Sequence, residues 1–256
     1  MNIGKEIGVG NTATVYEWGT DKRKVLKLFR AGYPEGDAEF EFRNALALNE
    51  LDLPKPQAYE LVCHEGRTGI IYDRVEGQPL DGWVMQTLDL AGCAGHMANL
   101  HQAVLRHTVH DVSDYKSFLG HHLRHMPPGH EAEQAAALQL LAGLADGDTL
   151  CHGDFHPGNI LIADGRTMLI DFMNICRGVA LYDVARTVFL VQYTPVPAGV
   201  PDHEQDDFRQ LKKTLADAYL AEMKITREQI ADYLTVIRAA RLGECPDEPV
   251  AVVAEE

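Results

Sequence analysis

Three polar side chains in residues 150–174 have the types and the spacing needed for metal-assisted transfer chemistry. The stretch reads LCHGDFHPGNILIADGRTMLIDFMN, in which Asp154 is followed by Asn159 and then by Asp171. One carboxylate can accept a proton from an attacking hydroxyl. The oxygens of a second carboxylate and of an amide are hard ligands, which magnesium takes together with phosphate oxygens and water. The pattern predicts strand, tight loop, strand, turn and strand, with Pro157 keeping the loop from becoming helix.

The sequence of this loop, HGDFHPGN, resembles that of the aminoglycoside phosphotransferase and choline kinase family. The members of this family are relatives of the protein kinases that act on small molecules. An Asp followed five residues later by an Asn is also the spacing of the kinase catalytic loop. The resemblance implies that Asp154 orients and deprotonates the hydroxyl of an acceptor, and that Asn159 and Asp171 hold magnesium. It further implies that His152 orients the loop.

Two positions separate this loop from the loop of protein kinases. Protein kinases carry Arg where this chain has Gly153, and they carry Gly two residues after the metal-binding Asp, where this chain has Met173. No activation segment ending in Ala-Pro-Glu follows. The resemblance therefore implies a kinase of a soluble small molecule. The competing interpretation is a β-hairpin whose polar loop happens to contain these residues.

A glycine-containing turn lies near the start of the chain. Residues 2–18 predict two strands joined by a turn that holds Gly8-x-Gly10-x-x-Ala13. Because a strand follows, and not a helix, the turn suits a kinase lid over phosphates better than a dinucleotide fold. The kinase pattern then implies that Val15 covers the adenine. The alternative is an ordinary hairpin that contains glycine.

A lysine within an apolar strand is the next candidate. Residues 24–29, KVLKLF, predict a strand in which Lys27 lies between two leucines, a costly place for an ammonium that has no partner. In kinases its partners are the nucleotide phosphates and a helix Glu, and residues 37–51 predict that helix. Glu41 matches the paired Glu of the family, with Glu39 as the second choice. The apolar face of the helix is expected from Phe42, Ala45, Leu46, Leu48 and Leu51.

Residues 57–65 and 68–75 alternate as the two strands of a hairpin, with Gly66 in the turn. In the family, the backbone at the end of the second strand hydrogen-bonds adenine. The resemblance therefore implies that Asp73 and Val75 lie beside the base and bind it through main-chain groups.

From residue 79 onward the chain is expected to be largely helical. Apolar periodicity predicts helices over 89–107, 131–145, 180–193, 204–223 and 226–241. His101 is interpreted as a satisfied core histidine near the catalytic loop. Asp183 matches a buried Asp of the kinase fold, so the resemblance implies that it braces the backbone of the catalytic loop. The residues after Gly243 have little to pack against and are expected to be mobile.

Composition limits the classes of partner. The 256 residues carry 38 acidic and 23 basic side chains, a formal net charge of −15 that repels nucleic acid and anionic membranes. We expect neither a signal peptide nor a membrane span, because no cationic start precedes an apolar run and no apolar run approaches the required length of ~18 residues. The five cysteines show no metal-ligand spacing, so they predict reduced thiols in a cytoplasmic protein.

Together these features predict an α+β protein with a kinase-like two-lobed fold. Residues 1–76 are expected to form a small β-rich nucleotide-binding lobe with one helix, and residues 77–256 a larger, mostly α-helical lobe. The resemblance implies ATP or GTP with Mg²⁺ in the cleft and transfer of the γ-phosphoryl group to a small-molecule alcohol. The acidic excess, and the acidic side chains in the helices after residue 201, favour a cationic amino sugar or amino alcohol as acceptor. The alternatives are a metabolic sugar or homoserine-type kinase and a nucleotide-binding pseudo-kinase.

Overall fold

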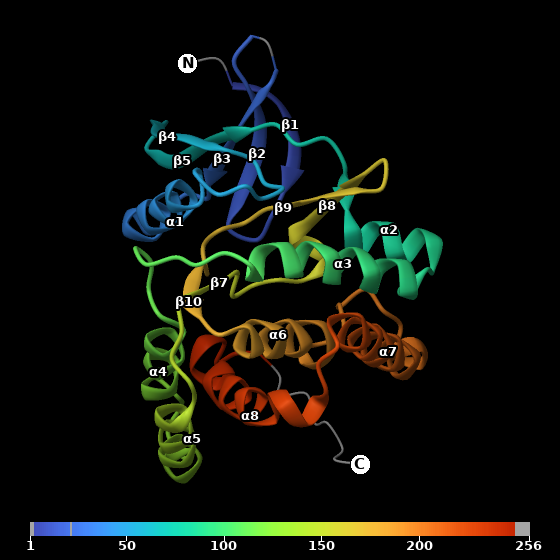
Figure 1. The fold of residues 1–256 in the computed structure, drawn as a ribbon. Coiled ribbons are helices and arrows are strands. Elements are labelled where there is room, and N and C mark those ends of the chain that lie inside the picture. The colour runs from blue at the N-terminus through green and yellow to red at the C-terminus, as the bar shows by residue number, and fades with distance from the viewer. Residues whose placement is uncertain (1–2, 21, 249–256) are drawn as a thin grey trace. The chain divides into compact units, whose positions relative to one another are not determined.

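Alternating apolar residues in the first part of the chain form a five-stranded antiparallel sheet in the order β1-β2-β3-β5-β4 (Figure 1). Leu26 of β3 packs with Val62 and Ile71 in the core of this sheet. The β4–β5 hairpin turns at Glu65 and Gly66, whose φ angles of 50° and 75° suit a two-residue turn that follows the strand twist. The strands are β1 (Ile3–Val9), β2 (Ala13–Trp18), β3 (Lys24–Phe29), β4 (Ala58–His64) and β5 (Arg67–Asp73).

Helix α1 (Glu35–Ala47) packs against β4 and β5 (Figure 1). The helix ends at Ala47, with Leu48 as its C-cap, whereas the sequence predicted that it would continue to residue 51. The expectation that Leu46 lies on the apolar face is also wrong, because this residue is 41 % exposed. The buried face instead includes the polar residues Glu41 and Asn44, which have partners described below. Apolar periodicity misplaced the face because two of its members are polar.

The structure is a computed structural model that describes residues 3–20 and 22–248. Two compact units make up the chain, and each contains two segments of it. The first unit contains Met1–Pro79 with Ile160–Asn174, and the second contains Leu80–Asn159 with Ile175–Glu256. The predicted division into residues 1–76 and 77–256 differs from this grouping, because it assigns Ile160–Asn174 to the second part of the chain.

That returning segment forms a hairpin of the first unit. Strands β8 (Ile160–Ala163) and β9 (Arg166–Leu169) join β6 (Gln78–Pro79) in a three-stranded sheet of order β6-β8-β9. The hairpin turns at Asp164 and Gly165, with φ angles of 49° and 72°. The predicted alternation of strand, loop, strand, turn and strand in residues 150–174 is therefore confirmed.

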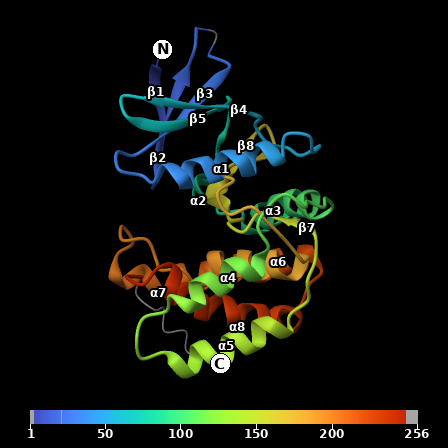
Figure 2. The same cartoon turned by 90° about the vertical axis from the view of Figure 1, so that its left-hand side faces the viewer.

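The second unit is mostly helical, with a two-stranded sheet of β7 and β10. In this unit α4, α5 and α8 pack against one another (Figure 2). Its elements are α2 (Leu80–Thr87), α3 (Leu90–Leu105), α4 (Tyr115–Arg124), α5 (Glu131–Gly143), β7 (Thr149–Cys151), the 3₁₀ turn η1 (Pro157–Asn159), β10 (Cys176–Gly178), α6 (Ala180–Val188), the π-helical turn η2 (Phe189–Tyr193), the 3₁₀ turn η3 (Asp202–Glu204), α7 (Gln205–Met223) and α8 (Arg227–Glu244).

The helices follow the local signals of the sequence. At the start of α3, the Asp89 carboxylate accepts the Gly92 N–H at 2.8 Å. At the start of α8, Thr226 and Gln229 form a capping box. Helix α3 buries an apolar face that includes His101. None of the helices in the described part of the chain is long and apolar enough to cross a membrane. The fold is α+β, with a sheet-rich first unit and a helical second unit.

Candidate active site

Lys27 forms the centre of a charged group in the first unit. Its Nζ donates hydrogen bonds to Glu41 Oε1 and Oε2 at 2.7 and 2.9 Å, and to Asp171 Oδ1 at 3.1 Å. The Tyr72 hydroxyl donates to Glu41 Oε1 at 3.2 Å. Glu39, the second choice as partner of Lys27, is exposed. Strand β3, helix α1 and the segment after β9 therefore each supply one charge to a single cluster.

Electrostatics keeps Lys27 protonated. Burial alone would lower the pKa of Lys27, but the carboxylates of Asp171 and Glu41 more than offset it, and the pKa lies above its ordinary value. Burial raises the pKa of the Glu41 carboxyl, which is only 1 % exposed. The cluster therefore holds a fixed ammonium, the group that kinases use to bind phosphates.

The backbone at Asp171 has a positive φ angle, and the residues that follow it are hydrogen-bonded to α1. The φ of Asp171 is 67°, in the left-handed region, which Asp tolerates better than most residues with a side chain. The Asn44 amide donates to the Phe172 and Met173 carbonyls at 3.1 and 3.0 Å. Asn44 was not among the predicted residues. Its position three residues after Glu41, on the same face of α1, is the signal that could have identified it.

The glycine-rich turn joins β1 and β2. Gly8 lies opposite Val15 in the strand pairing, and the Gly10 N–H donates to the Ala13 carbonyl at 2.8 Å. A Cβ added at Gly8 or Gly10 would come no closer than 3.8 and 3.5 Å to its neighbours, which is ordinary contact. The packing of the chain itself therefore does not require glycine at these two positions.

At the end of β5, the side chain of Asp73 and the main chain of Val75 differ in their hydrogen bonding. The carboxylate of Asp73 accepts the Gln57 N–H at 3.0 Å and the Tyr59 hydroxyl at 2.7 Å. Val75 makes no main-chain hydrogen bond to another described residue. The side chain of Asp73 thus fixes the β4–β5 hairpin, and the main chain at Val75 has unused hydrogen-bonding capacity.

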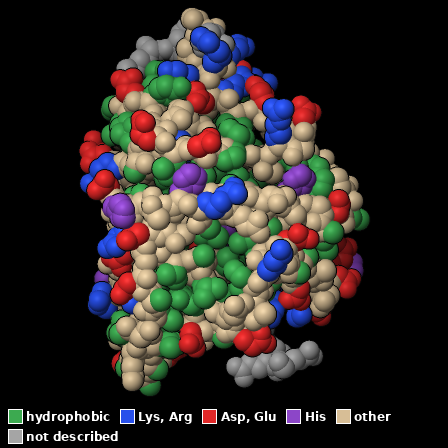
Figure 3. All heavy atoms as spheres, viewed as in Figure 1, with side chains coloured by type: hydrophobic (Ala, Val, Ile, Leu, Met, Phe, Trp, Pro, Cys, Tyr) green, Lys and Arg blue, Asp and Glu red, His purple; other side chains and the backbone are tan. Residues whose placement is uncertain are grey.

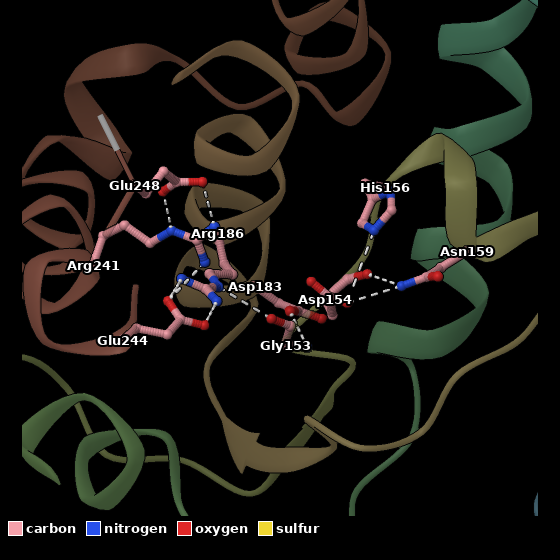
Figure 4. A network of polar contacts seen from close by, with 9 residues as sticks. All are labelled: Gly153, Asp154, His156, Asn159, Asp183, Arg186, Arg241, Glu244 and Glu248. Carbon is pink, nitrogen blue, oxygen red and sulfur yellow. Dashed lines mark hydrogen bonds and ion pairs between the residues drawn. The ribbon is translucent and has the colours of Figure 1, made fainter. Parts of the chain in front are cut away.

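The loop that is predicted to be catalytic lies in the second unit between β7 and η1. The Asn159 amide donates to the main-chain oxygen of Asp154 and to its Oδ2, both at 2.9 Å (Figure 4). The Gly158 N–H donates to His156 Nδ1 at 3.1 Å, so a neutral His156 carries its proton on Nε2, 3.8 Å from Asp154 Oδ2. Asn159 is buried and Asp154 is partly exposed. The structure brings Asp154 and Asn159 together and leaves the Asp154 carboxylate accessible.

Asp183 of α6 holds the backbone of this loop, as predicted. Its carboxylate oxygens accept the N–H groups of His152 and Gly153 at 2.6 and 2.8 Å. His101 Nε2 lies 2.9 Å from the same carboxylate, and its Nδ1 lies 2.5 Å from the Tyr219 hydroxyl. Burial would raise the pKa of Asp183, but the His101 hydrogen bond and the backbone donors lower it overall. His101 is thus a satisfied core histidine, and His152 is fixed through its main chain.

A second anchor of the loop was not predicted. Arg186 Nε donates to the Gly153 carbonyl at 3.1 Å, and its other nitrogens form a two-point ion pair with Glu244 at 2.9 and 2.5 Å (Figure 4). Arg241 contacts Glu244 at 3.1 Å and Glu248 at 2.6 Å. The expectation of mobility after Gly243 is therefore wrong for residues 244–248, because their carboxylates pair with these two arginines. Residues 249–256 lie outside the described part of the chain.

This anchor predicts a dependence of stability on pH. Burial would raise the pKa of Glu244, but Arg186 and Arg241 lower it from 4.5 to about 2. A carboxyl with a depressed pKa stabilises the fold above its unfolded-state value, and that contribution disappears as the pH falls from 4.5 to about 2. At neutral pH we expect Glu244→Gln to lower the free energy of unfolding by about 3 kcal/mol.

Urea denaturation of both proteins at several pH values measures this difference. The stability gap between the parent and Glu244→Gln should close towards pH 2. The matched control is Glu222→Gln, because Glu222 is an exposed glutamate at the end of α7. A gap that is independent of pH would contradict the ionic role of Glu244.

Asn159 in the second unit and Asp171 in the first each carry oxygen atoms of the kind that magnesium takes. The Nδ2 of Asn159 donates to Asp154, so its Oδ1 is the atom that can ligate a metal ion. Asp171 supplies carboxylate oxygens. In residues 3–20 and 22–248, no three His, Cys, Asp or Glu side chains cluster in a way that could hold a metal ion alone. Magnesium commonly takes one or two protein carboxylates and completes its shell with water and substrate phosphates, so this sparse oxygen set is suitable.

Comparison with known proteins identifies the fold and the family of the chain. The sequence has no match among curated proteins. Three similar solved structures share its fold. The first is a thermostable mutant of aminoglycoside phosphotransferase APH(4)-Ia with ADP and hygromycin B, at a TM-score of 0.63, 16 % identity, and coverage of 95 % of this chain and 86 % of that one.

The second is aminoglycoside phosphotransferase APH(3'')-Id from Streptomyces rimosus with ADP and streptomycin, at a TM-score of 0.60, 18 % identity, and coverage of 89 % and 90 %. The third is a choline/ethanolamine kinase family protein from Mesorhizobium loti, at a TM-score of 0.60, 13 % identity, and coverage of 97 % and 83 %. Residues 3–223 match the sequence profile described as the phosphotransferase enzyme family, APH. The match covers most of the chain, and the chain therefore belongs to the APH phosphotransferase enzyme family.

Proposed function

We propose that this protein transfers the γ-phosphoryl group of ATP to a hydroxyl group of a small molecule. The observation that carries the proposal is the family match over residues 3–223, which includes each residue expected to do this chemistry. ADP or the ATP analogue AMP-PNP occupies several similar solved structures, which supports ATP as the donor.

In this proposal each residue has one role. The acceptor oxygen attacks the γ-phosphorus, its proton passes to the Asp154 carboxylate, and the bond from the γ-phosphorus to the bridging oxygen of ADP breaks. The Asn159 amide orients Asp154, and the Lys27 ammonium binds the α- and β-phosphates. Asn159 and Asp171 would hold magnesium, which would neutralise charge on the phosphate oxygens. These groups act by position and charge, because phosphoryl transfer requires little covalent help from the protein.

The glycine-rich turn supports a donor that carries phosphates. The protein's own packing does not explain glycine at positions 8 and 10, since a Cβ there would meet its neighbours at ordinary distances. Glycine has no side chain, so it would let a nucleotide approach the backbone closely at these two positions. Val15 and the main chain at Val75 would then contact the adenine.

For the acceptor we propose a cationic molecule of the amino sugar or amino alcohol class. Hygromycin B and streptomycin occupy similar solved structures, and this chain has a formal net charge of −15. Figure 3 shows acidic and basic side chains mixed over one face, without a broad basic area. Asp217 is a poor candidate for binding this acceptor, because Lys213 and Arg227 already pair with it at 2.9 and 2.5 Å.

An ATP-consumption screen over amino sugars, amino alcohols and neutral sugars tests both parts of this proposal. We expect a cationic compound to be the best acceptor. Its KM should rise with added salt by more than the KM for ATP, because the Debye length falls from ~10 Å at 0.1 M to ~3 Å at 1 M. A neutral best acceptor with a KM that salt does not change would contradict the cationic class. AMP-PNP binding without turnover of any alcohol would contradict the transfer reaction.

A further inference from the structure

A cavity of about 820 Å³ in the first unit is distinct from the phosphate-binding cluster. Lys27, Glu41, Asp171 and the glycine-rich turn do not line it. Among residues expected at the nucleotide, it shares only Asp73 and Val75, at the end of β5. Its size is typical of small-molecule sites. Five cations and three carboxylates line it, although the whole chain is strongly acidic.

One of these cations is buried without a partner. Lys55 is 6 % exposed, and its Nζ has no hydrogen-bond partner. Its backbone lies between Pro54 and Pro56, and the Leu169 N–H of β9 donates to the Pro54 carbonyl at 2.8 Å. Both prolines fix φ, so the backbone on either side of Lys55 is restricted. The backbone position of Lys55 is therefore built into the fold.

No carboxylate in the described part of the chain forms a hydrogen bond with Lys55 Nζ. Arg74 pairs with Glu17 at 2.8 Å and with Glu76 at 2.7 Å, so the charge of Glu76 is already used. The Asp73 carboxylate accepts hydrogen bonds from the Gln57 N–H and the Tyr59 hydroxyl. The third carboxylate of the lining, Asp164, is exposed in the β8–β9 turn.

Arg166 is the second cation of the lining without a carboxylate partner. It is exposed at the start of β9, and it forms no ion pair within residues 3–20 and 22–248. A guanidinium offers two parallel donors that match the oxygens of a phosphate, while an ammonium offers a compact point charge. Lys55 and Arg166 therefore offer the cavity one ammonium and one guanidinium of these two kinds.

We propose that this cavity binds a small molecule that carries a phosphate dianion, through the Lys55 ammonium and the Arg166 guanidinium. An isolated buried ammonium costs free energy, and an anion within hydrogen-bonding distance removes that cost. Burial lowers the pKa of Lys55, and the nearby carboxylates of Asp73 and Glu50 offset this effect only in part, because the pKa remains below its ordinary value. The site is separate from the transfer chemistry, so this proposal does not depend on the proposed function.

Calorimetric titration of the full-length protein with inorganic phosphate, glucose 6-phosphate and glucose tests the proposal. Saturating AMP-PNP and magnesium are present, so that the proposed phosphate positions beside Lys27 are occupied. We expect both phosphates to bind and glucose not to bind. Tighter binding of the sugar phosphate identifies a phosphorylated metabolite as the ligand, and equal binding identifies the phosphate ion.

Lys55→Met should weaken phosphate binding by about tenfold or more, because it removes a charged hydrogen-bond donor from a buried site. The same change should raise Tm in the absence of phosphate and reduce the rise in Tm that phosphate causes. Arg166→Gln, at an exposed position, gives a second test that does not disturb the core. Lys5→Met, at an exposed lysine of β1, is the matched control and should bind phosphate normally.

Two results would overturn the proposal. The first is the absence of any phosphate-dependent heat or Tm change in the parent protein at millimolar phosphate. The second is unchanged phosphate binding in both Lys55→Met and Arg166→Gln, which would place the bound phosphate elsewhere. If the parent protein does not bind AMP-PNP, that result contradicts the proposed function and not the phosphate site. The failure of one proposal can therefore be distinguished from the failure of the other.

Discussion

Asp154→Asn is expected to lower kcat by about 10²–10⁴-fold, the usual contribution of a general base. The Asn amide cannot accept the proton of the acceptor hydroxyl at neutral pH. Its carbonyl oxygen can still accept the hydrogen bond that Asn159 now donates to Asp154 Oδ2 at 2.9 Å. The loop geometry should therefore survive, and AMP-PNP affinity should be nearly unchanged. Steady-state kinetics and calorimetric titration measure the two quantities.

A matched control keeps this test specific. Asp148→Asn makes the same chemical change at an Asp that lies near the loop in sequence and pairs with Arg177 at 3.0 Å on the surface. It should leave kcat near the parent value. Near-normal turnover of Asp154→Asn would remove Asp154 from the role of base.

Lys27→Met is expected to remove most activity and also to destabilise the fold by about 3–5 kcal/mol. The reason is the group that remains, because Glu41 is 1 % exposed and would lose the ammonium that neutralises it. In this variant, burial raises the pKa of Glu41. A carboxyl with a raised pKa favours the folded state below its unfolded-state value and loses that favour as the pH rises. The stability deficit should therefore shrink in acid.

The double variant Lys27→Met/Glu41→Gln separates the two effects. A neutral amide in place of the Glu41 carboxylate removes the uncompensated charge, so the double variant should regain much of the stability that Lys27→Met loses. Activity should not return, since the phosphate-binding ammonium is still missing. Urea denaturation and turnover are measured on the same preparations. A single variant as stable as the parent at every pH would contradict the ionic account of this cluster.

Local patterns in the sequence predicted much of the fold and of this site. The five-residue spacing from Asp154 to Asn159, the lone Lys27 within an apolar strand, and the alternation of the hairpins are short-range features. Short-range features depend on backbone geometry that a few residues determine. The strands and the loop therefore agree with the structure. The pairing of Lys27 with Glu41 was implied by the family resemblance, and the structure shows it.

Features that depend on tertiary packing could not be predicted in this way. Arg186 and Glu244 are 58 residues apart, and no periodic signal relates them. The exposed Leu46 follows from the burial of Glu41 and Asn44, whose polar contacts decide which face of α1 lies inward. Lys55 is a single charged residue between two prolines, and its burial becomes evident only when β9 packs beside it. In each case the deciding partner is distant in the sequence.

The path of the chain through its two units has a consequence for recombination. Segment Ile160–Asn174 leaves the second unit and joins the first, carrying Asp171 to Lys27. A single crossover near residue 79 would join a sheet from one parent to a returning segment from another. The Lys27–Asp171 pair and the Asn44 contacts would then form between residues inherited from different parents. We infer that exchange of the first unit between family members requires three breakpoints, near residues 79, 159 and 174, so that the sheet and the returning segment are inherited together.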